Sequence, residues 1–383
     1  MRVGRRGRLL LAVTAVFAVF LGVAGPSSAA QKYSLEGGKG RVTHHAYGKL
    51  NGGIVYDYLV YTPVGWKKTD RLPLYVALHG CAMNAADMMS ATWLNPIADR
   101  ERFLVAYPDN GGGCWQAVSD DASYAIATGT PPHNIGRGQG GEADIVAGMT
   151  KQTIAKYNVD ASRVYLAGGS AGAFATAGTA VAYPELYTAI GIVAGGGPGM
   201  AVTCAGYPDA VVPAYAKWAR EQLGKRAHVI PFWVIGGTLD PLGNAGGVAG
   251  CSQHAYAEML YLNNLVKPSP TATVPGMCGL LPPRATAYGG ASACSDTYMT
   301  NALATKHGQV PNGYHYIRRS AQDTKTMCEI GEQWIVKGMG HTWPGRAEPK
   351  GPTTSELTWA FFSRFHLDNH GQVTCNNGKF DNR

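Results

Sequence analysis

One serine set among glycines constrains the fold of this chain most: residues 168–172 read Gly-Gly-Ser-Ala-Gly. An apolar run at 164–167 precedes them and a small-residue run at 173–182 follows, which predicts a strand, a sharp turn and a helix. In that context G-x-S-x-G is the pattern of a nucleophile elbow, which presents the Ser170 hydroxyl at a sheet edge. Glycines suit the turn because it is strained and leaves no room for Cβ atoms. The pentapeptide alone can arise by chance in a chain with 51 glycines, so the flanking elements carry the prediction.

The first thirty residues predict an export signal that is cleaved near Gln31. A basic stretch is followed by an apolar run at 9–25 and by the small residues Ser28-Ala29-Ala30. A retained membrane anchor is the alternative, and Gly25-Pro26 at the end of the apolar run argues against it. Cleavage removes four arginines and no acid, which lowers the formal net charge from +8 to +4. We therefore expect a secreted, extracellular monomer that binds no nucleic acid and has no stable membrane insertion.

The remaining residues, 31–383, predict a single α/β domain. Apolar runs indicate strands at 56–62, 72–78, 103–107, 164–167, 189–194, 231–235 and 333–336. Helical patterns occur at 142–157, after the elbow, and behind a predicted capping box at Thr353-x-x-Glu356. Strands that alternate with helices predict a mainly parallel central sheet with helices on both faces. The range from about 199 to 320 departs from this rhythm and is expected to be a disulfide-rich insertion, with one core strand and helix at 231–265.

An activated serine needs a base and an acid that orients the base, and in the α/β-hydrolase order the acid precedes the histidine. Asp240 is the candidate acid because it follows the 231–235 strand by a glycine-rich turn. A turn-capping role before Pro241 is the alternative, and Asp296 and Asp323 are rival acids in less regular sequence. Asp144 precedes the serine and fits the start of a helix.

His341 is the candidate base, because it lies on a glycine-flanked loop directly after the last predicted strand. His79 ends an earlier strand before Gly80-Cys81, where a loop that binds the oxyanion belongs. We expect His79 to hold this loop by hydrogen bonding rather than to move protons. The backbone N–H groups of Cys81 and Ala171 would then form the oxyanion hole.

Several motifs together resemble the secreted polyhydroxybutyrate depolymerase family of esterases, which also contains feruloyl and acetylxylan esterases. They are Leu78-His79-Gly80-Cys81, Trp93 with Ala98-Asp99-Arg100, residues 103–108, Cys114-Trp115, Tyr157-x-Val159-Asp160-x-x-Arg163-Val164-Tyr165, and Gly338-Met339-Gly340-His341-Thr342-Trp343-Pro344-Gly345. The resemblance implies an α/β-hydrolase fold and a triad of Ser170, Asp240 and His341. It also implies a Cys81–Cys114 disulfide and substrate contacts by His79, Trp115 and Trp343. It implies no metal or organic cofactor.

The substrate stays open between two ester classes. The leading expectation is a polyester, poly(3-hydroxybutyrate) or a related polyhydroxyalkanoate, and the neighbouring one is a feruloyl or acetyl ester of plant xylan. An inactive hydrolase scaffold that binds polymer is the non-enzyme alternative. The elbow departs from many relatives, which carry a bulkier residue before the serine, and no separate polymer-binding module follows a linker.

Eight cysteines in an exported chain predict four disulfides. There is no C-x-x-C motif and no zinc-like spacing, so we expect no metal site. Beyond the pair that the resemblance implies, sequence alone leaves the connectivity open. Proximity along the chain suggests three further pairs: Cys204–Cys251, Cys278–Cys294 and Cys328–Cys375.

Overall fold

The computed structural model describes seven stretches of the chain: 33–49, 55–115, 136–200, 212–241, 250–267, 303–323 and 328–376. The chain divides into two units, Met1–Lys32 and Tyr33–Arg383, and the description below concerns the second unit. The expected export signal and its cleavage site lie outside the described residues. Much of the expected insertion lies outside them as well.

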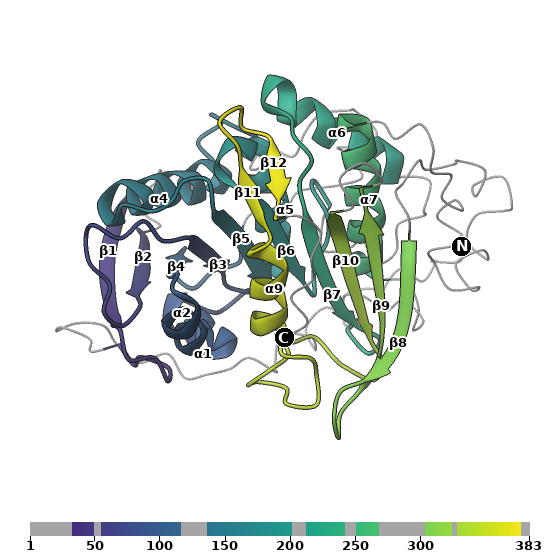
Figure 1. The fold of residues 1–383 in the computed structure, drawn as a ribbon, viewed down its shortest axis with the longest axis horizontal. Helices are drawn as coiled ribbons and strands as arrows, with labels where there is room; N and C mark the ends of the chain where they lie inside the picture. The colour runs from purple at the N-terminus through teal and green to yellow at the C-terminus, as the bar shows by residue number, and fades with distance from the viewer. Residues whose placement is uncertain are drawn as a thin grey trace, which may run out of the picture. The chain divides into compact units, whose positions relative to one another are not determined.

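A mixed sheet of ten strands forms the centre of the described residues, in the order β1-β2-β4-β3-β5-β6-β7-β10-β9-β8 (Figure 1). The six strands from β4 to β10 run parallel, whereas β1, β2, β8 and β9 pair antiparallel at the two edges. The bounds are β1 (Arg41–Lys49), β2 (Val55–Thr62), β3 (Leu74–Leu78), β4 (Leu104–Asp109), β5 (Val164–Gly169), β6 (Ala189–Val193), β7 (Phe232–Gly237), β8 (Leu303–Gln309), β9 (His315–Gln322) and β10 (Glu329–Val336).

Helices cover both faces of this sheet (Figure 1), which confirms the predicted fold class. On one face lie α4 (Glu142–Tyr157), α5 (Ala171–Ala182), α6 (Val212–Leu223) and α7 (Cys251–Val266). On the other lie α1 (Ala85–Thr92), α2 (Leu94–Glu101) and α9 (Thr354–Phe362). Val76 and Leu78 of β3 join the first core, and Tyr75 and Ala77 join the second. The inner strands are therefore apolar on both faces, which is why they read as continuous apolar runs.

Each inner strand predicted from an apolar run is present, and the helix at 142–157 has the predicted bounds. The outer strands β1, β8 and β9 and the helices α1 and α2 were not predicted. The capping box predicted at Thr353 is wrong: Thr353 precedes α9, but its side chain makes no capping hydrogen bond. Glu356 instead accepts a hydrogen bond from the Arg100 guanidinium of α2, which ties the two helices together.

The range expected as an insertion contributes to the sheet itself. Five elements, α6, β7, α7, β8 and most of β9, fall between residues 199 and 320. A short hairpin of β11 (Phe365–Leu367) and β12 (Val373–Cys375) follows α9. Among the described residues, no helix combines the length and the apolar character needed to cross a membrane.

Candidate active site

Ser170 occupies a strained turn between β5 and α5. Its backbone has φ 55° and ψ −122°, a conformation that L-residues rarely adopt. The Ser170 N–H donates to the Val193 carbonyl at 2.9 Å, which anchors the turn to β6. A Cβ at Gly168 would clash with the Gly172 carbonyl, and one at Gly172 would clash with the Leu78 carbonyl. The glycines are thus required by close backbone approach, as a nucleophile elbow demands.

His341 and Asp240 lie together although 101 residues separate them. The His341 Nδ1 is 2.9 Å from the Asp240 Oδ2, and both side chains are largely buried. A carboxylate can only accept a hydrogen bond, so we assign the proton to Nδ1. The Nε2 atom is then the one that can accept a proton from a serine.

Backbone contacts fix the two loops that carry this pair. The Leu239 N–H donates to the Met339 carbonyl at 2.9 Å, and the Gly338 N–H donates to the Thr238 hydroxyl at 2.8 Å. Because β7 and β10 are parallel neighbours, both loops leave the sheet at its carboxyl edge. Ser170 leaves β5 at that same edge. The sheet therefore brings the three predicted residues to one edge.

The rival acids have other surroundings or lie outside the described residues. Asp323 accepts from the Lys267 ammonium at 3.0 Å. Asp144 lies in the first turn of α4, where it accepts hydrogen bonds from two backbone N–H groups and the Tyr183 hydroxyl. Asp296 lies outside the described residues.

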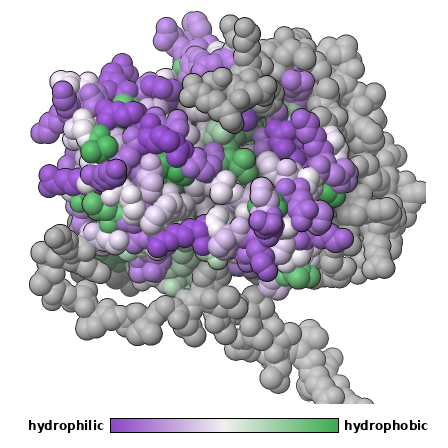
Figure 2. Space-filling view, turned by 60° about the horizontal axis from the view of Figure 1, so that its bottom comes forward, coloured by the Kyte–Doolittle hydropathy of each residue, from purple (hydrophilic) through white to green (hydrophobic). Residues whose placement is uncertain are grey.

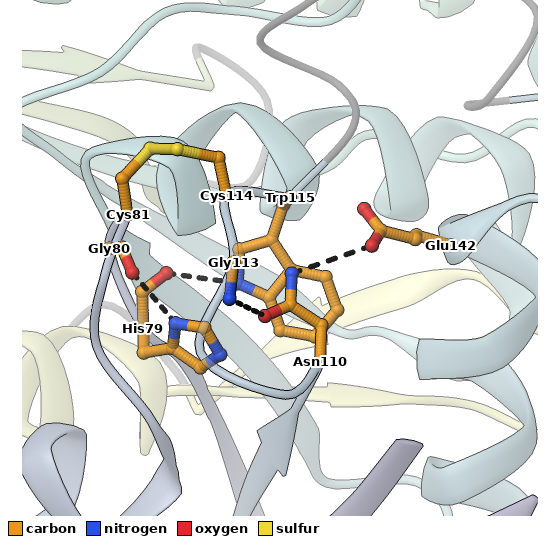
Figure 3. Close-up of a disulfide and its surroundings, with 8 residues drawn as sticks. All are labelled: His79, Gly80, Cys81, Asn110, Gly113, Cys114, Trp115 and Glu142. Atoms are coloured by element: carbon orange, nitrogen blue, oxygen red, sulfur yellow. Dashed lines mark hydrogen bonds between the residues drawn. A yellow bond between two sulfur atoms is a disulfide. The ribbon is translucent and has the colours of Figure 1, made fainter. Parts of the chain in front are cut away.

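The loop after β3 lies against the elbow. A Cβ placed on Gly80 would lie 3.3 Å from the Ser170 Cβ. Figure 3 shows the Cys81–Cys114 disulfide that joins this loop to the loop after β4. Among the turn, loop and cap hydrogen bonds of the described residues, none uses the N–H of Cys81 or Ala171. Both N–H groups are thus available to a developing oxyanion.

His79 and Trp115 hold the loop after β3 by hydrogen bonds. The His79 Nδ1 donates to the Gly80 carbonyl at 2.7 Å, and the Trp115 Nε1 donates to the His79 carbonyl at 2.9 Å (Figure 3). Burial lowers the pKa of His79, so its imidazole is neutral at neutral pH. The side chain positions the loop, which is the role expected for it.

The substrate contacts expected for His79, Trp115 and Trp343 do not match their burial. The first two side chains are fully buried and Trp343 is 7 % exposed. The Trp343 Nε1 donates to the Ser355 hydroxyl at 3.0 Å, and its ring lies beside Gly169. In this conformation, these buried rings hold the loops after β3 and β10 in place and are not surface residues of those loops.

A network of hydrogen bonds that the sequence did not predict holds the loop that contains Cys114. The Gly113 N–H donates to the Asn110 Oδ1 at 3.1 Å, and the Asn110 amide donates to the Glu142 carboxylate at 3.4 Å (Figure 3). The Tyr56 hydroxyl donates to the same carboxylate oxygen at 3.0 Å. The buried Glu142 at the start of α4 thus fixes the loop that the disulfide joins to Cys81. The sequence signal for it was Asn110, which follows the predicted strand at 103–107 and directly precedes three glycines.

The remaining cysteines fit the expected pairs where the structure describes them. Cys328 pairs with Cys375, which fixes β12 beside the start of β10. Cys251 is disulfide-bonded. Its suggested partner Cys204 lies outside the described residues, and so do Cys278 and Cys294.

Replacing both Cys81 and Cys114 by alanine should reduce activity more than stability. The disulfide restrains the loop that offers the Cys81 N–H, and a misplaced oxyanion donor costs about 10²-fold or more in rate. The kcat of the double variant on a soluble ester should fall by about that factor. The matched control is the Cys328→Ala, Cys375→Ala variant, which removes a disulfide far from the elbow. An equal loss of kcat in both variants would contradict this role for Cys81.

A buried carboxyl on α7 lies against the loop after β6. The Glu258 side chain is fully buried, and among the described residues neither of its carboxyl oxygens has a hydrogen-bond partner. A Cβ at Gly197, on the loop after β6, would clash with this carboxyl. Burial raises the pKa of Glu258 well above its usual value of 4.5. The folded protein therefore keeps a proton that the unfolded chain releases above that pH.

Glu258→Gln should stabilise the protein at neutral and alkaline pH. The folded state binds more protons than the unfolded state above pH 4.5, so this group lowers the free energy of unfolding as pH rises, by up to about 1.4 kcal/mol per pH unit. The glutamine amide has no proton to release, so the variant should lose this part of the dependence of the free energy of unfolding on pH. Urea unfolding at pH 5, 7 and 9 measures that dependence. If the free energy of unfolding fell equally with rising pH in the variant and the wild type, Glu258 would be ionised in the folded state.

Comparison with known proteins matches part of the chain to an esterase family. Residues 56–211, which include the loop after β3 and the elbow, match the family model described as Esterase PHB depolymerase. This stretch carries the domain that the model describes. The match ends before Asp240 and His341, so those two residues rest on the structure and not on the family match.

Relatives of the esterase domain include enzymes with different substrates. Feruloyl esterase B of Neurospora crassa is 39% identical over 132 residues, which cover 34% of this chain and 41% of the relative. Poly(3-hydroxyalkanoate) depolymerase C of Paucimonas lemoignei is 37% identical over 124 residues, covering 32% and 28%. Acetylxylan esterase A of Emericella nidulans is 37% identical over 127 residues, covering 33% and 38%. The matches thus span less than half the length of these relatives.

A solved structure supports the fold over most of the chain. The acetyl xylan esterase from Aspergillus awamori superimposes with a TM-score of 0.53 and covers 84% of this chain and 99% of its own. Its sequence is 18% identical, so the likeness concerns the fold alone. The chain has an α/β-hydrolase fold, as the resemblance implied.

Proposed function

We propose that this protein is an exported serine esterase that uses Ser170, His341 and Asp240 as its catalytic triad. The hydrogen bond of 2.9 Å between His341 and Asp240, at the sheet edge where Ser170 follows β5, is the observation that carries the proposal. The family match of the elbow region supports ester hydrolysis independently.

The reaction proceeds through an acyl-enzyme. Ser170 Oγ attacks the ester carbonyl while His341 Nε2 accepts its proton, and Asp240 stabilises the imidazolium that forms. The N–H groups of Cys81 and Ala171 hold the oxyanion. His341 then protonates the leaving alcohol, and water attacks the acyl-enzyme with His341 again acting as base.

The substrate we propose is a polyester, poly(3-hydroxybutyrate) or a related polyhydroxyalkanoate. Similarity to the Paucimonas depolymerase supports this class. Leu239, directly before the acid, is 66% exposed, which offers an apolar contact for a polymer surface. Figure 2 turns the lower side of Figure 1 toward the viewer, where the loop between β10 and α9 lies, and shows apolar and pale residues among hydrophilic ones.

The second candidate is a feruloyl or acetyl ester of xylan. It is favoured by the identity to the feruloyl esterase of Neurospora crassa, which is 39% over 132 residues. Both candidates use the same triad, so only the substrate separates them.

A substrate panel tests the proposal. The protein should clear an emulsion of poly(3-hydroxybutyrate) and release soluble hydroxy acids, with weaker activity on methyl ferulate and acetylated xylan. Faster turnover of the aromatic or acetyl esters would assign the second candidate. Leu239→Ser should slow polymer clearing while soluble esters are cleaved at the wild-type rate. No hydrolysis of any ester would leave the inactive scaffold as the correct description.

A further inference from the structure

A basic pocket lies away from the candidate active site, between β1, the loop after β2 and the end of α4. Its volume is about 580 Å³, within the range typical of small-molecule sites. Four cationic side chains line it, and no carboxylate belongs to the described residues of its wall. The cations are Lys39, Arg41, Lys68 and Lys156.

No side-chain ion pair to these four cations is found in the described part of the chain. Asp70 pairs with the Arg102 guanidinium, and Asp160 pairs with that of Arg163. The Asp99 carboxylate lies beside the wall, where it accepts hydrogen bonds from the N–H groups of Lys39 and Val64. Lys156 donates to the His45 Nδ1 at 2.9 Å. Burial, together with the charge of Lys156, lowers the pKa of His45 to about 4. This partner is therefore neutral, and the four cations outnumber the Asp99 carboxylate.

The rest of the wall suits a ring-shaped ligand. Trp66 and Tyr157 line the pocket with ring centroids 5.5 Å apart. The Tyr157 ring is 6% exposed, so the partly exposed Trp66 ring is the aromatic face that it supports for a ligand. The Trp66 Nε1 is buried without a hydrogen-bond partner in the described residues. Hydroxyls of Thr43 and Thr62 add polar groups to the wall. Aromatic faces contact the C–H face of a sugar, and cations bind its carboxylate.

The pocket and the triad lie at opposite edges of the sheet. Thr62 ends β2 near the start of β4, and α4 ends shortly before β5 begins. The triad instead follows the carboxyl ends of β5, β7 and β10. A six-residue strand spans about 17 Å, so a ligand in the pocket does not reach the reacting ester.

We propose that the basic pocket binds a segment of an acidic polysaccharide, a chain of uronate sugars. Such binding would attach the enzyme to an anionic matrix and leave the opposite, catalytic edge free. The proposal stands on the pocket alone and does not depend on which ester the enzyme cleaves. An inorganic anion would use the cations but not the rings, and a neutral sugar would use the rings but not the cations.

Calorimetry with a trimer of galacturonate tests the proposal on the full mature protein. The Arg41→Gln, Lys68→Gln variant should bind the trimer about tenfold or more weakly, since each exposed cation lost removes a charge-assisted hydrogen bond. Lys217→Gln with Lys225→Gln, two exposed cations outside the pocket, is the matched control and should bind as wild type does. Raised salt should weaken binding. Hydrolysis of a soluble ester should be the same in all three proteins.

Three results would overturn the proposal. Equal weakening in the control variant would mean that net charge, not the pocket, attracts the trimer. Equal binding of a neutral galactose trimer would exclude recognition of the carboxylate. Displacement of the galacturonate trimer by inorganic phosphate at a lower concentration than by free trimer would identify a simple anion site.

Discussion

Ser170→Ala should reduce kcat/KM for a soluble ester by a factor on the order of 10⁴ or more, because nothing else in the elbow can form the acyl-enzyme. Alanine carries a Cβ as serine does, so φ 55° costs both residues a similar strain. The fold should therefore not change. Circular dichroism and the unfolding midpoint should match those of the wild type.

Ser34→Ala is the control for this substitution, since the Ser34 hydroxyl contacts the N–H and the side chain of Glu36 and none of the three predicted triad residues. It should retain full activity. If Ser170→Ala kept even about a tenth of the wild-type turnover, the nucleophile would lie elsewhere.

Asp240→Asn should reduce kcat by about 10⁴-fold with little change in the fold. The amide nitrogen can donate a hydrogen bond to His341 Nδ1, which favours the tautomer that carries its proton on Nε2. That tautomer cannot accept the serine proton, and the imidazolium also loses its neighbouring charge. Steady-state kinetics on a soluble ester measure the loss.

Asp323→Asn is the matched control, because Asp323 is a buried aspartate with an ion pair to Lys267. Removing that pair should lower the unfolding midpoint but preserve kcat. A larger loss of kcat in Asp323→Asn than in Asp240→Asn would mean that the acid is misassigned.

The inner sheet could be predicted from the sequence because its strands are buried on both faces. Residues 74–78 and 164–167 are apolar at every position, and β3 and β5 lie where those runs occur. Strand β9, next to the edge strand β8, has polar residues instead, including Arg318 and Arg319. Arg318 binds Glu329 and Glu332 of β10, a pairing that exists only once the strands are adjacent. Partly exposed outer strands of this kind carry no apolar run to detect.

The residues of the candidate site that lie in motifs, and their order along the chain, could be predicted from the sequence. Ser170, Asp240 and His341 each follow a strand, and parallel strands bring their carboxyl ends to one edge. The support from Asn110 and Glu142 was not predictable, since it joins a loop to a helix start 32 residues away. Burial of Trp115 and Trp343 was missed for a similar reason: aromatic rings in loops read as exposed until the loops pack.

Labelling with a fluorophosphonate, followed by peptide mass spectrometry, tests the central claim most directly. The reagent forms a stable adduct only with a serine that is activated by a base. The account predicts one adduct, on the peptide that contains Ser170, with none in Ser170→Ala and much slower labelling in Asp240→Asn. An adduct on another serine, or no adduct in an enzyme that hydrolyses esters, would contradict it.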